Sequence, residues 1–413
     1  IAATVFTFYF SFVQFRFFKH SIELVKGDYA DPNDAGEVSH FQALATALSG
    51  TVGLGNIAGV AVAVGIGGPG ATFWMILAGL LGMASKFTEC TLGVKYRNEY
   101  EDGTVSGGPM YYNSKGFKEL GLPGGKFLAV LFSIFCILGA FGGGNMFQAN
   151  QAHAQISGIF GDYPGWITGL VFAAVVFAVI VGGIKSIARV TEKIVPFMAA
   201  IYVGSALLIL LMNFSALPAA ISAIIGGAFA PTAVAGGAVG ALIQGFKRAA
   251  FSNEAGIGTA PMAHGAAKTN EPVREGLVAM LGPVVDTIIV CTMSALSLIM
   301  TGVWDVCDSD GISLTAEAFE TALPGFGAYL LTVCVFVFAI STMLSFPYYG
   351  TKCFSFIFGA RRDYLYKWFY ILTIPLGATA TLGTVVGIFD GAYALMAFPT
   401  MISALLLSPA VVK

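Results

Sequence analysis

The chain has 413 residues, of which 56% are hydrophobic and only 11% are charged. A typical soluble domain has about 25% charged residues, so this composition excludes a soluble enzyme and predicts an all-α membrane protein. The formal net charge of −2 provides no basic stripe for a nucleic-acid backbone, which excludes nucleic acid as a partner. The four histidines and six cysteines form no catalytic or zinc-binding motif that we recognise, so we expect no enzyme.

Apolar runs alternate with polar or Gly/Pro-rich connections and predict eleven transmembrane helices. We number them helices 1 to 11 and expect them at residues 1–18, 40–66, 70–95, 125–158, 164–186, 194–213, 230–264, 273–302, 325–350, 364–383 and 385–411. The chain begins at Ile1 inside an apolar run, so we expect the first helix to have a truncated start. A short interfacial helix is expected within residues 215–231.

The distribution of charge predicts the orientation of these helices. If helix 1 runs from outside to inside, nearly all Lys and Arg residues, including Lys86, fall in cytoplasmic loops or at the adjacent helix ends. The outer loops have no Lys or Arg, and the longest, residues 304–324, has five acidic residues. This pattern follows the positive-inside rule and predicts a multi-pass protein of the cell membrane with a cytoplasmic C-terminus. Lys247 and Arg248 are exceptions because they lie within helix 7.

Two of the expected helices are interrupted. Helix 2 contains Gly50, Gly53 and Gly55, and each glycine costs a helix about 1 kcal/mol relative to alanine. Helix 7 is interrupted by a polar and Gly-rich stretch over residues 244–261. The interruptions lie five helices apart, which predicts a leading helix (1–25), a first five-helix repeat (40–213) and an inverted second repeat (214–413). An inverted repeat with a broken first helix in each half is typical of secondary transporters.

The break in helix 2 predicts a ligand site. Unwound backbone in a membrane is tolerated only where it lines a cavity or contacts a ligand. The free N–H groups of Leu54 and Gly55, at the positive end of a half-helix starting near Asn56, are suited to a substrate carboxylate. We assign Thr51 and Gly53 to the same substrate site. The alternative is a glycine-rich face for close helix packing.

Four stretches of the sequence resemble a known family. Residues 50–59 (GTVGLGNIAG) and 251–261 (FSNEAGIGTAP) are similar to the two signature stretches of the alanine or glycine:cation (sodium:alanine) symporter family, and residues 88–97 and 107–112 resemble it as well. The resemblance implies sodium-driven uptake of alanine or glycine. It also implies a leucine-transporter-type fold, with one extra helix ahead of ten core helices.

The same resemblance implies a site for Na⁺. In that fold, sodium lies between carbonyl groups of the first core helix and two adjacent hydroxyl residues of the eighth, which here is helix 9. Ser341 and Thr342 match the hydroxyl pair, and the carbonyl groups of Ser49 and Val52 are the matching partners. The alternative is that both hydroxyls bond back to carbonyls of their own helix.

Further residues are candidates for the pocket wall and for gating. Phe147, Gln148 and Phe246 lie near the breaks and are candidates for the substrate wall, although each is equally compatible with core packing. Ionisable residues at membrane depth are functional candidates by default. We expect Lys247 and Arg248, on the cytoplasmic half of helix 7, to pair with Glu89 or Glu254, either in an inner gate or as a constitutive ion pair. Asp286 is a candidate for a second cation site near Asn56 or for proton binding.

These observations predict a secondary active transporter that couples sodium entry to uptake of a small neutral amino acid by alternating access. The alternatives are a proton-coupled or other small-solute symporter of the same fold, and a channel. A channel requires a continuous polar pore, whereas a symporter shows saturable uptake.

Overall fold

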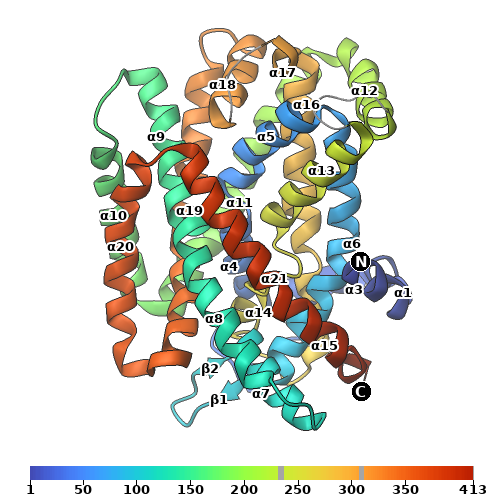
Figure 1. Ribbon diagram of the computed structural model, residues 1–413, viewed down its shortest axis with the longest axis vertical. Coiled ribbons are helices and arrows are strands. Elements are labelled where there is room, and N and C mark those ends of the chain that lie inside the picture. The colour runs from blue at the N-terminus through green and yellow to red at the C-terminus, as the bar shows by residue number, and fades with distance from the viewer. Residues whose placement is uncertain (231–236, 307–310, 413) are drawn as a thin grey trace.

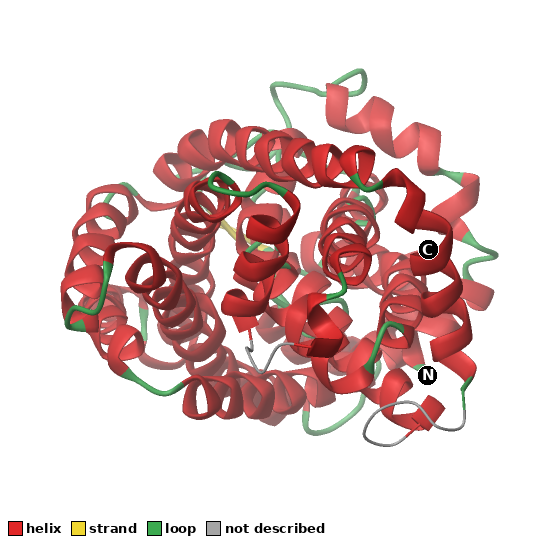
Figure 2. Cartoon of the chain, turned by 90° about the horizontal axis from the view of Figure 1, so that it is seen from above, coloured by secondary structure: helices red, strands yellow, loops and turns green. Residues whose placement is uncertain are grey.

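The computed structural model describes residues 1–230, 237–306 and 311–412, and helices make up most of this chain (Figures 1 and 2). Within the described residues, the only sheet is an antiparallel hairpin of β1 (Asn98–Glu99) and β2 (Val105–Ser106). The structure therefore confirms the expected all-α class. Asp308 and Asp310 of the acidic loop lie outside the described residues.

Six segments of the described chain are long and apolar enough to cross a membrane, and one bent pair of helices is a seventh candidate. The six segments are α6 (Gly70–Lys95), α8–η2–α9 (Gly125–Phe141, Gly142–Met146 and Phe147–Phe160), α11 (Gly183–Met212), α15–η4–α16 (Pro272–Ala279, Val284–Cys291 and Thr292–Thr301), α19 (Gly327–Phe358) and α21 (Leu382–Val412). The count of eleven spans and the boundaries of the repeats stay predictions.

The described chain also contains shorter elements, apart from the two broken helices described below. They are α1 (Ala2–Tyr9), α2 (Val13–Arg16), α3 (Phe18–Lys26), α7 (Pro109–Glu119), α10 (Gly165–Ile180), η3 (Phe214–Ala216), α12 (Leu217–Phe229), α17 (Val303–Val306), α18 (Gly311–Ala322), η5 (Ala360–Arg362) and α20 (Asp363–Thr379). The expected short helix within residues 215–231 corresponds to α12. The expected continuous helix over residues 1–18 is wrong, because Ser11 and Phe12 adopt positive φ angles of 51° and 57° and separate α1 from α2.

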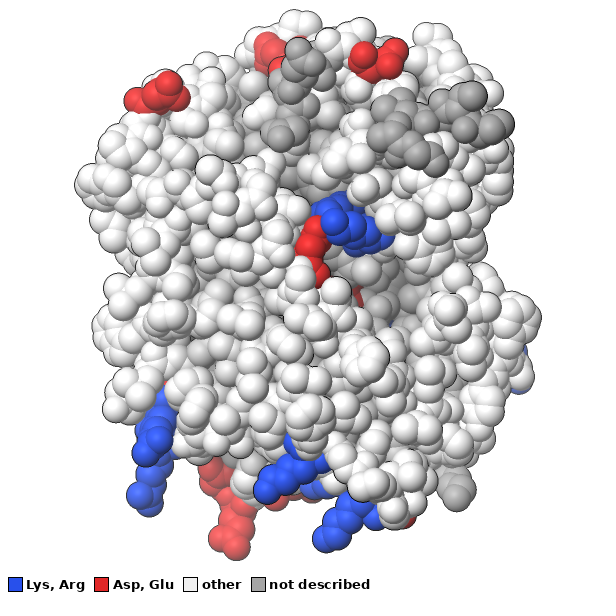
Figure 3. Space-filling model, viewed as in Figure 1, with Lys and Arg blue, Asp and Glu red and all other residues white. Residues whose placement is uncertain are grey.

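Charged side chains distinguish the two ends of the molecule (Figure 3). In this view the charged side chains at the upper end are Asp and Glu, whereas the lower end has Lys and Arg with some Asp and Glu among them. We call these the acidic end and the basic end. Lys86 does not follow the expected pattern: it is 3% exposed and lies inside α6, well before the helix ends at Lys95.

The first broken helix consists of α4 (His40–Thr51), η1 (Leu54–Asn56) and α5 (Ala58–Gly67). Ser39 begins it with a capping box: its hydroxyl accepts from the Gln42 N–H at 3.2 Å, and its own N–H donates to the Gln42 side chain at 3.1 Å. The helix direction changes by 60° at the break. The expected interruption of helix 2 is therefore confirmed.

The second broken helix consists of α13 (Gly237–Asn253) and the short α14 (Ala260–His264). Between them Glu254, Gly256 and Gly258 have positive φ angles of 53°, 92° and 94°, which no helix accommodates. The expected interruption of helix 7 is confirmed as well. The long helix α6 packs against α13, α14 and α15 and so positions the second break within the bundle.

Candidate functional site

A narrow buried cavity lies where the two broken helices meet. It has room for about one water molecule, with a volume of about 10 Å³. Its walls come from the two broken helices and from α9, α19, α21 and the π-helical segment η2. The lining residues are Gly50, Thr51, Gly53, Gly55, Gly143, Gln148, Phe251, Glu254, Thr342, Phe346 and Tyr393. Six of the expected site residues therefore line one cavity, namely Thr51, Gly53, Gly55, Gln148, Glu254 and Thr342.

The backbone at the first break is already engaged in a hydrogen bond. The Leu54 N–H donates to Gln148 Oε1 at 3.0 Å, and Gln148 Nε2 donates to the Gly143 carbonyl at 2.9 Å. The expectation that the N–H of Leu54 is free is therefore wrong in this conformation. Unwound backbone in a membrane must find a partner, and the nearest acceptor here is an amide oxygen. Gln148 thus bridges the break to the π-helical turn at Gly143.

Two phenylalanines on α13 differ in their position relative to the cavity. Phe251 lines it and is 6% exposed, whereas Phe246 is 37% exposed and packs beside Trp74, with ring centroids 6.3 Å apart. Residues five apart on a helix point about 140° away from each other, which explains the difference. The expected wall role of Phe246 is wrong. Phe147 lies behind the wall and contacts Phe251 edge-on at 5.3 Å.

The hydroxyl pair on α19 faces the first break. Ser49 Oγ donates to the Ser341 carbonyl at 2.6 Å, and Ser341 Oγ donates to Ser49 Oγ at 2.8 Å. Thr342 Oγ1 is buried and has no hydrogen-bond partner within the described residues. Thr342 Oγ1 lies so close to Gly53 that a methyl group added to Gly53 would collide with it. Val52 is buried beside them at the end of α4. The residues predicted for sodium thus lie together, with one unpaired oxygen.

A second polar cluster surrounds Asn56. Asn56 Nδ2 donates to Ser252 Oγ at 3.1 Å and to the Asp286 carbonyl at 2.9 Å, and so joins η1, α13 and η4. Asp286 Oδ1 accepts from Thr287 at 2.6 Å, while Asp286 Oδ2 is buried without a partner in the described chain. No cluster of three or more His, Cys, Asp or Glu side chains among the described residues is suited to a metal ion. Any cation here requires carbonyl or hydroxyl oxygens as additional ligands.

The acidic side chains near the second break satisfy its own polar groups. Glu254 accepts from the hydroxyls of Thr259 and Tyr393, the latter at 3.0 Å. Glu89 on α6 accepts from the Gly256 N–H, and its other oxygen has no partner in the described chain. The buried ammonium of Lys86 interacts electrostatically with both carboxylates and with Asp286. The sequence alone did not indicate this contact of Lys86 with the buried carboxylates, because Lys86 lies near the end of its apolar run and was expected at the helix end.

Lys247 and Arg248 have a different partner from the expected ones. Asp390 Oδ2 on α21 lies 2.6 Å from Lys247 Nζ and 2.9 Å from Arg248 Nη2. Charged groups of both signs meet in a hollow on the face of the molecule (Figure 3). Both cations precede the break on a helix that begins near the acidic end (Figure 1), so they lie on the acidic-end half of the broken helix. The expected pairing with Glu89 or Glu254 is wrong, because both cations pair with Asp390.

Comparisons with known proteins agree with this architecture. The solved structure of MhsT in complex with L-phenylalanine superposes with a TM-score of 0.59 at 15% identity, covering 90% of this chain and 89% of that chain. Such a likeness shows a shared fold, that of the leucine-transporter-type secondary transporters. A fold with two broken helices of this kind is typical of secondary transporters.

Sequence comparison defines the family. Residues 1–413 match the sodium:alanine symporter family, to which the chain belongs. It is 44% identical over 406 residues to the sodium/alanine symporter AgcS of Methanococcus maripaludis, covering 97% of this chain and 89% of that protein. It is 34% identical over 384 residues to the amino-acid carrier protein AlsT of Bacillus subtilis, covering 92% and 78%. These matches support sodium-coupled amino-acid symport, and they agree with the resemblance of the four sequence stretches.

Proposed function

We propose that this protein couples the entry of sodium to the uptake of alanine or glycine across the cell membrane by alternating access. The single observation that carries the proposal is the buried hydroxyl of Thr342, which faces Gly53 in the first break and has no hydrogen-bond partner in the described part of the chain. A buried hydroxyl without a partner costs about 1–3 kcal/mol, and a bound cation removes that cost. In this proposal Na⁺ is held by the hydroxyls of Ser341 and Thr342 and the carbonyls of Ser49 and Val52.

The substrate carboxylate binds at the first break in this proposal. Its ligands are the N–H groups of Leu54 and Gly55, with Thr51, Gly53 and Asn56 around them. The hydrogen bond from Leu54 to Gln148 supports this assignment, because an amide oxygen and a carboxylate oxygen are both acceptors and can exchange. In this proposal the substrate carboxylate replaces Gln148 as the acceptor for the Leu54 N–H.

The narrowness of the cavity supports a small substrate. Aromatic rings of Phe251, Phe346 and Tyr393 form much of its wall, and Gly144 has no room for a side chain because Phe346 lies against it. Alanine and glycine require the least widening of this cavity. Asp286 and Asn56 form a second polar cluster, which in this proposal binds a second cation or a proton.

The charge of the two ends supports an orientation of the protein in the membrane. We assign the basic end to the cytoplasm, which agrees with the positive-inside rule and gives the cytoplasmic C-terminus. In this proposal the pair between Arg248 and Asp390 lies toward the outside, contrary to the expected cytoplasmic half of helix 7, and closes the outer route in the inward-facing half of the cycle. In this proposal Glu254 and Glu89 hold the unwound backbone of the second break in place through their hydrogen bonds and so support the substrate site.

The test is uptake of radiolabelled alanine into proteoliposomes. With an inward sodium gradient, alanine should transiently accumulate above its equilibrium level, and choline in place of sodium should abolish this. Excess glycine should compete. Uptake driven by a proton gradient without sodium would instead support a proton-coupled symporter. Uptake that does not saturate with alanine would support a channel and overturn the proposal.

A further inference from the structure

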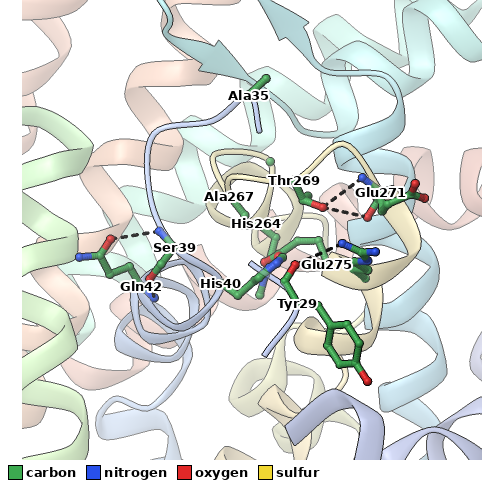
Figure 4. Close-up of polar contacts among 12 residues, drawn as sticks. Tyr29, Ala35, Ser39, His40, Gln42, His264, Ala267, Thr269, Glu271 and Glu275 are labelled. Carbon is green, nitrogen blue, oxygen red and sulfur yellow. Dashed lines mark hydrogen bonds and ion pairs between the residues drawn. The ribbon is translucent and has the colours of Figure 1, made fainter. Parts of the chain in front are cut away.

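Three ionisable side chains form a cluster near the basic end (Figure 4), and none of them lines the cavity. His40 begins α4, His264 ends α14, and Glu275 lies on α15; they are 4%, 1% and 0% exposed. His264 Nδ1 lies 2.5 Å from Glu275 Oε1, and His40 Nδ1 is hydrogen-bonded to Glu275 Oε2. One carboxylate thus joins the basic-end halves of both broken helices.

The backbone around the cluster is fastened across the same junction. Val38 pairs with Ala267 in an isolated parallel bridge, and the Lys268 N–H donates to the Val38 carbonyl at 2.8 Å. The guanidinium of Arg97 donates to the carbonyls of Ala35 and Ala267, each at 2.8 Å. The segment before α4 and the segment after α14 therefore move together or separate together.

The hydrogen bonds define the charge of the cluster. A carboxylate only accepts, so each imidazole donates from Nδ1, and both rings can be neutral with a single negative charge on Glu275. One additional proton on either ring neutralises the cluster and adds an ionic attraction between that imidazolium and the Glu275 carboxylate, because both partners of the hydrogen bond are then charged. The other ionisable groups that act on the cluster or bond beside it are Arg274, Asp34, Cys90 of α6, Arg97 and, through Gln42, Glu192.

We propose that His40, Glu275 and His264 form a proton-binding latch that holds α4 and α14 together and closes the route from the cavity to the basic end. This inference rests on the proposed transport function, because opening the cavity toward the cytoplasm requires these two half-helices to separate. Uptake of a proton tightens the latch, so acidification on the basic-end side slows opening. Histidine is the side chain suited to proton binding under physiological conditions, so pH is the variable to test.

The test compares His264→Gln and His40→Gln with the control His20→Gln. Glutamine retains a hydrogen-bond donor but does not titrate, and His20 forms an exposed contact with Glu23 at 3.2 Å on α3. In proteoliposomes of known orientation, the pH on the basic-end side is varied from 7.5 to 5.5 at a fixed pH on the other side. We expect alanine turnover of the parent and of His20→Gln to fall by about threefold to tenfold. Turnover of the two latch variants should change little. A parent that shows no pH dependence, or latch variants with the parent's profile, would overturn the latch.

A second measurement separates failure of the latch from failure of the transport proposal. Hydrogen–deuterium exchange of residues 36–50, corrected for the intrinsic pH dependence of exchange, reports opening of α4 without any transport. Protection should rise on acidification in the parent and in His20→Gln, but not in His264→Gln. If this pattern appears in a protein without sodium-driven alanine uptake, the latch stands and the transport proposal fails. If His264→Gln does not fold, Glu275→Gln replaces it and should show the same loss of pH-dependent protection; parent-like protection would overturn the latch.

Discussion

Arg248 and Asp390 join α13 to α21 through a contact of 2.9 Å between Nη2 and Oδ2. The same guanidinium lies 5.8 Å from the ring centroid of Phe389, and that ring stacks on Phe251 at 4.0 Å. Because Phe251 lines the cavity, the ion pair is connected to the candidate site through two stacked rings. The pair is therefore suited to closing the cavity toward the acidic end.

We expect Arg248→Ala to lower the initial rate of alanine uptake by about tenfold, because loss of one partner leaves the largely buried Asp390 poorly compensated. Lys247→Ala is the matched control: Lys247 contacts the same carboxylate, but its side chain is 45% exposed and water can replace it. Initial uptake rates at matched membrane insertion measure the difference. Equal losses in both variants would argue that Asp390 needs only nearby positive charge and that the stacked arrangement has no special role.

The glycines of the first break provide a second prediction. A methyl group at Gly55 would lie 2.7 Å from the ring of Phe251, whereas one at Gly59 would lie 3.6 Å from the same ring, an ordinary contact. We expect Gly55→Ala to weaken alanine binding by about tenfold or more and Gly59→Ala to change it by less than about twofold. Equilibrium binding of labelled alanine to purified protein tests this. Normal binding by Gly55→Ala would remove the first break from the substrate site.

The size of the cavity provides a third prediction, again with a matched pair. Phe251→Leu shortens a side chain that lines the cavity, so leucine should become a competitor of alanine uptake that is about tenfold stronger. Phe246→Leu makes the same chemical change on the outer side of α13 and should leave the competitor profile unchanged. The assay is inhibition of alanine uptake by glycine, leucine and tryptophan. A parent inhibited by tryptophan as strongly as by alanine would contradict a small pocket.

Part of this architecture could be predicted because it depends on local sequence. Three glycines within six residues weaken the helix around Gly53, and the polar run after Asn253 interrupts an apolar helix, so both breaks were predictable. The proposed sodium ligands depended on the family resemblance, since Ser341 and Thr342 alone are equally typical of ordinary membrane helices. Their proximity to the first break could not be calculated from spacing, because the contact between Ser49 and Ser341 spans 292 positions.

The predictions that were wrong depend on the direction of a side chain or on a contact between residues far apart in the sequence. Phe246 and Phe251 are equivalent by composition, and only the rotation of α13 distinguishes the wall residue from the outward-facing one. The partner of Arg248 lies 142 positions away, and the sequence does not show which helix packs beside α13 at that point. The cluster of His40, His264 and Glu275 has no sequence pattern, because His40 and Glu275 are 235 positions apart.

The sodium dependence of alanine binding to Thr342→Ala tests the central claim most directly. Loss of this hydroxyl should shift the sodium midpoint to higher concentration by about tenfold, while alanine affinity at saturating sodium stays near that of the parent, because the two sites are linked. Thr342→Ser retains the oxygen and should restore the parent's midpoint. An unchanged sodium midpoint in correctly inserted Thr342→Ala would contradict the account and place the ion elsewhere, with the cluster of Asn56 and Asp286 as the next candidate.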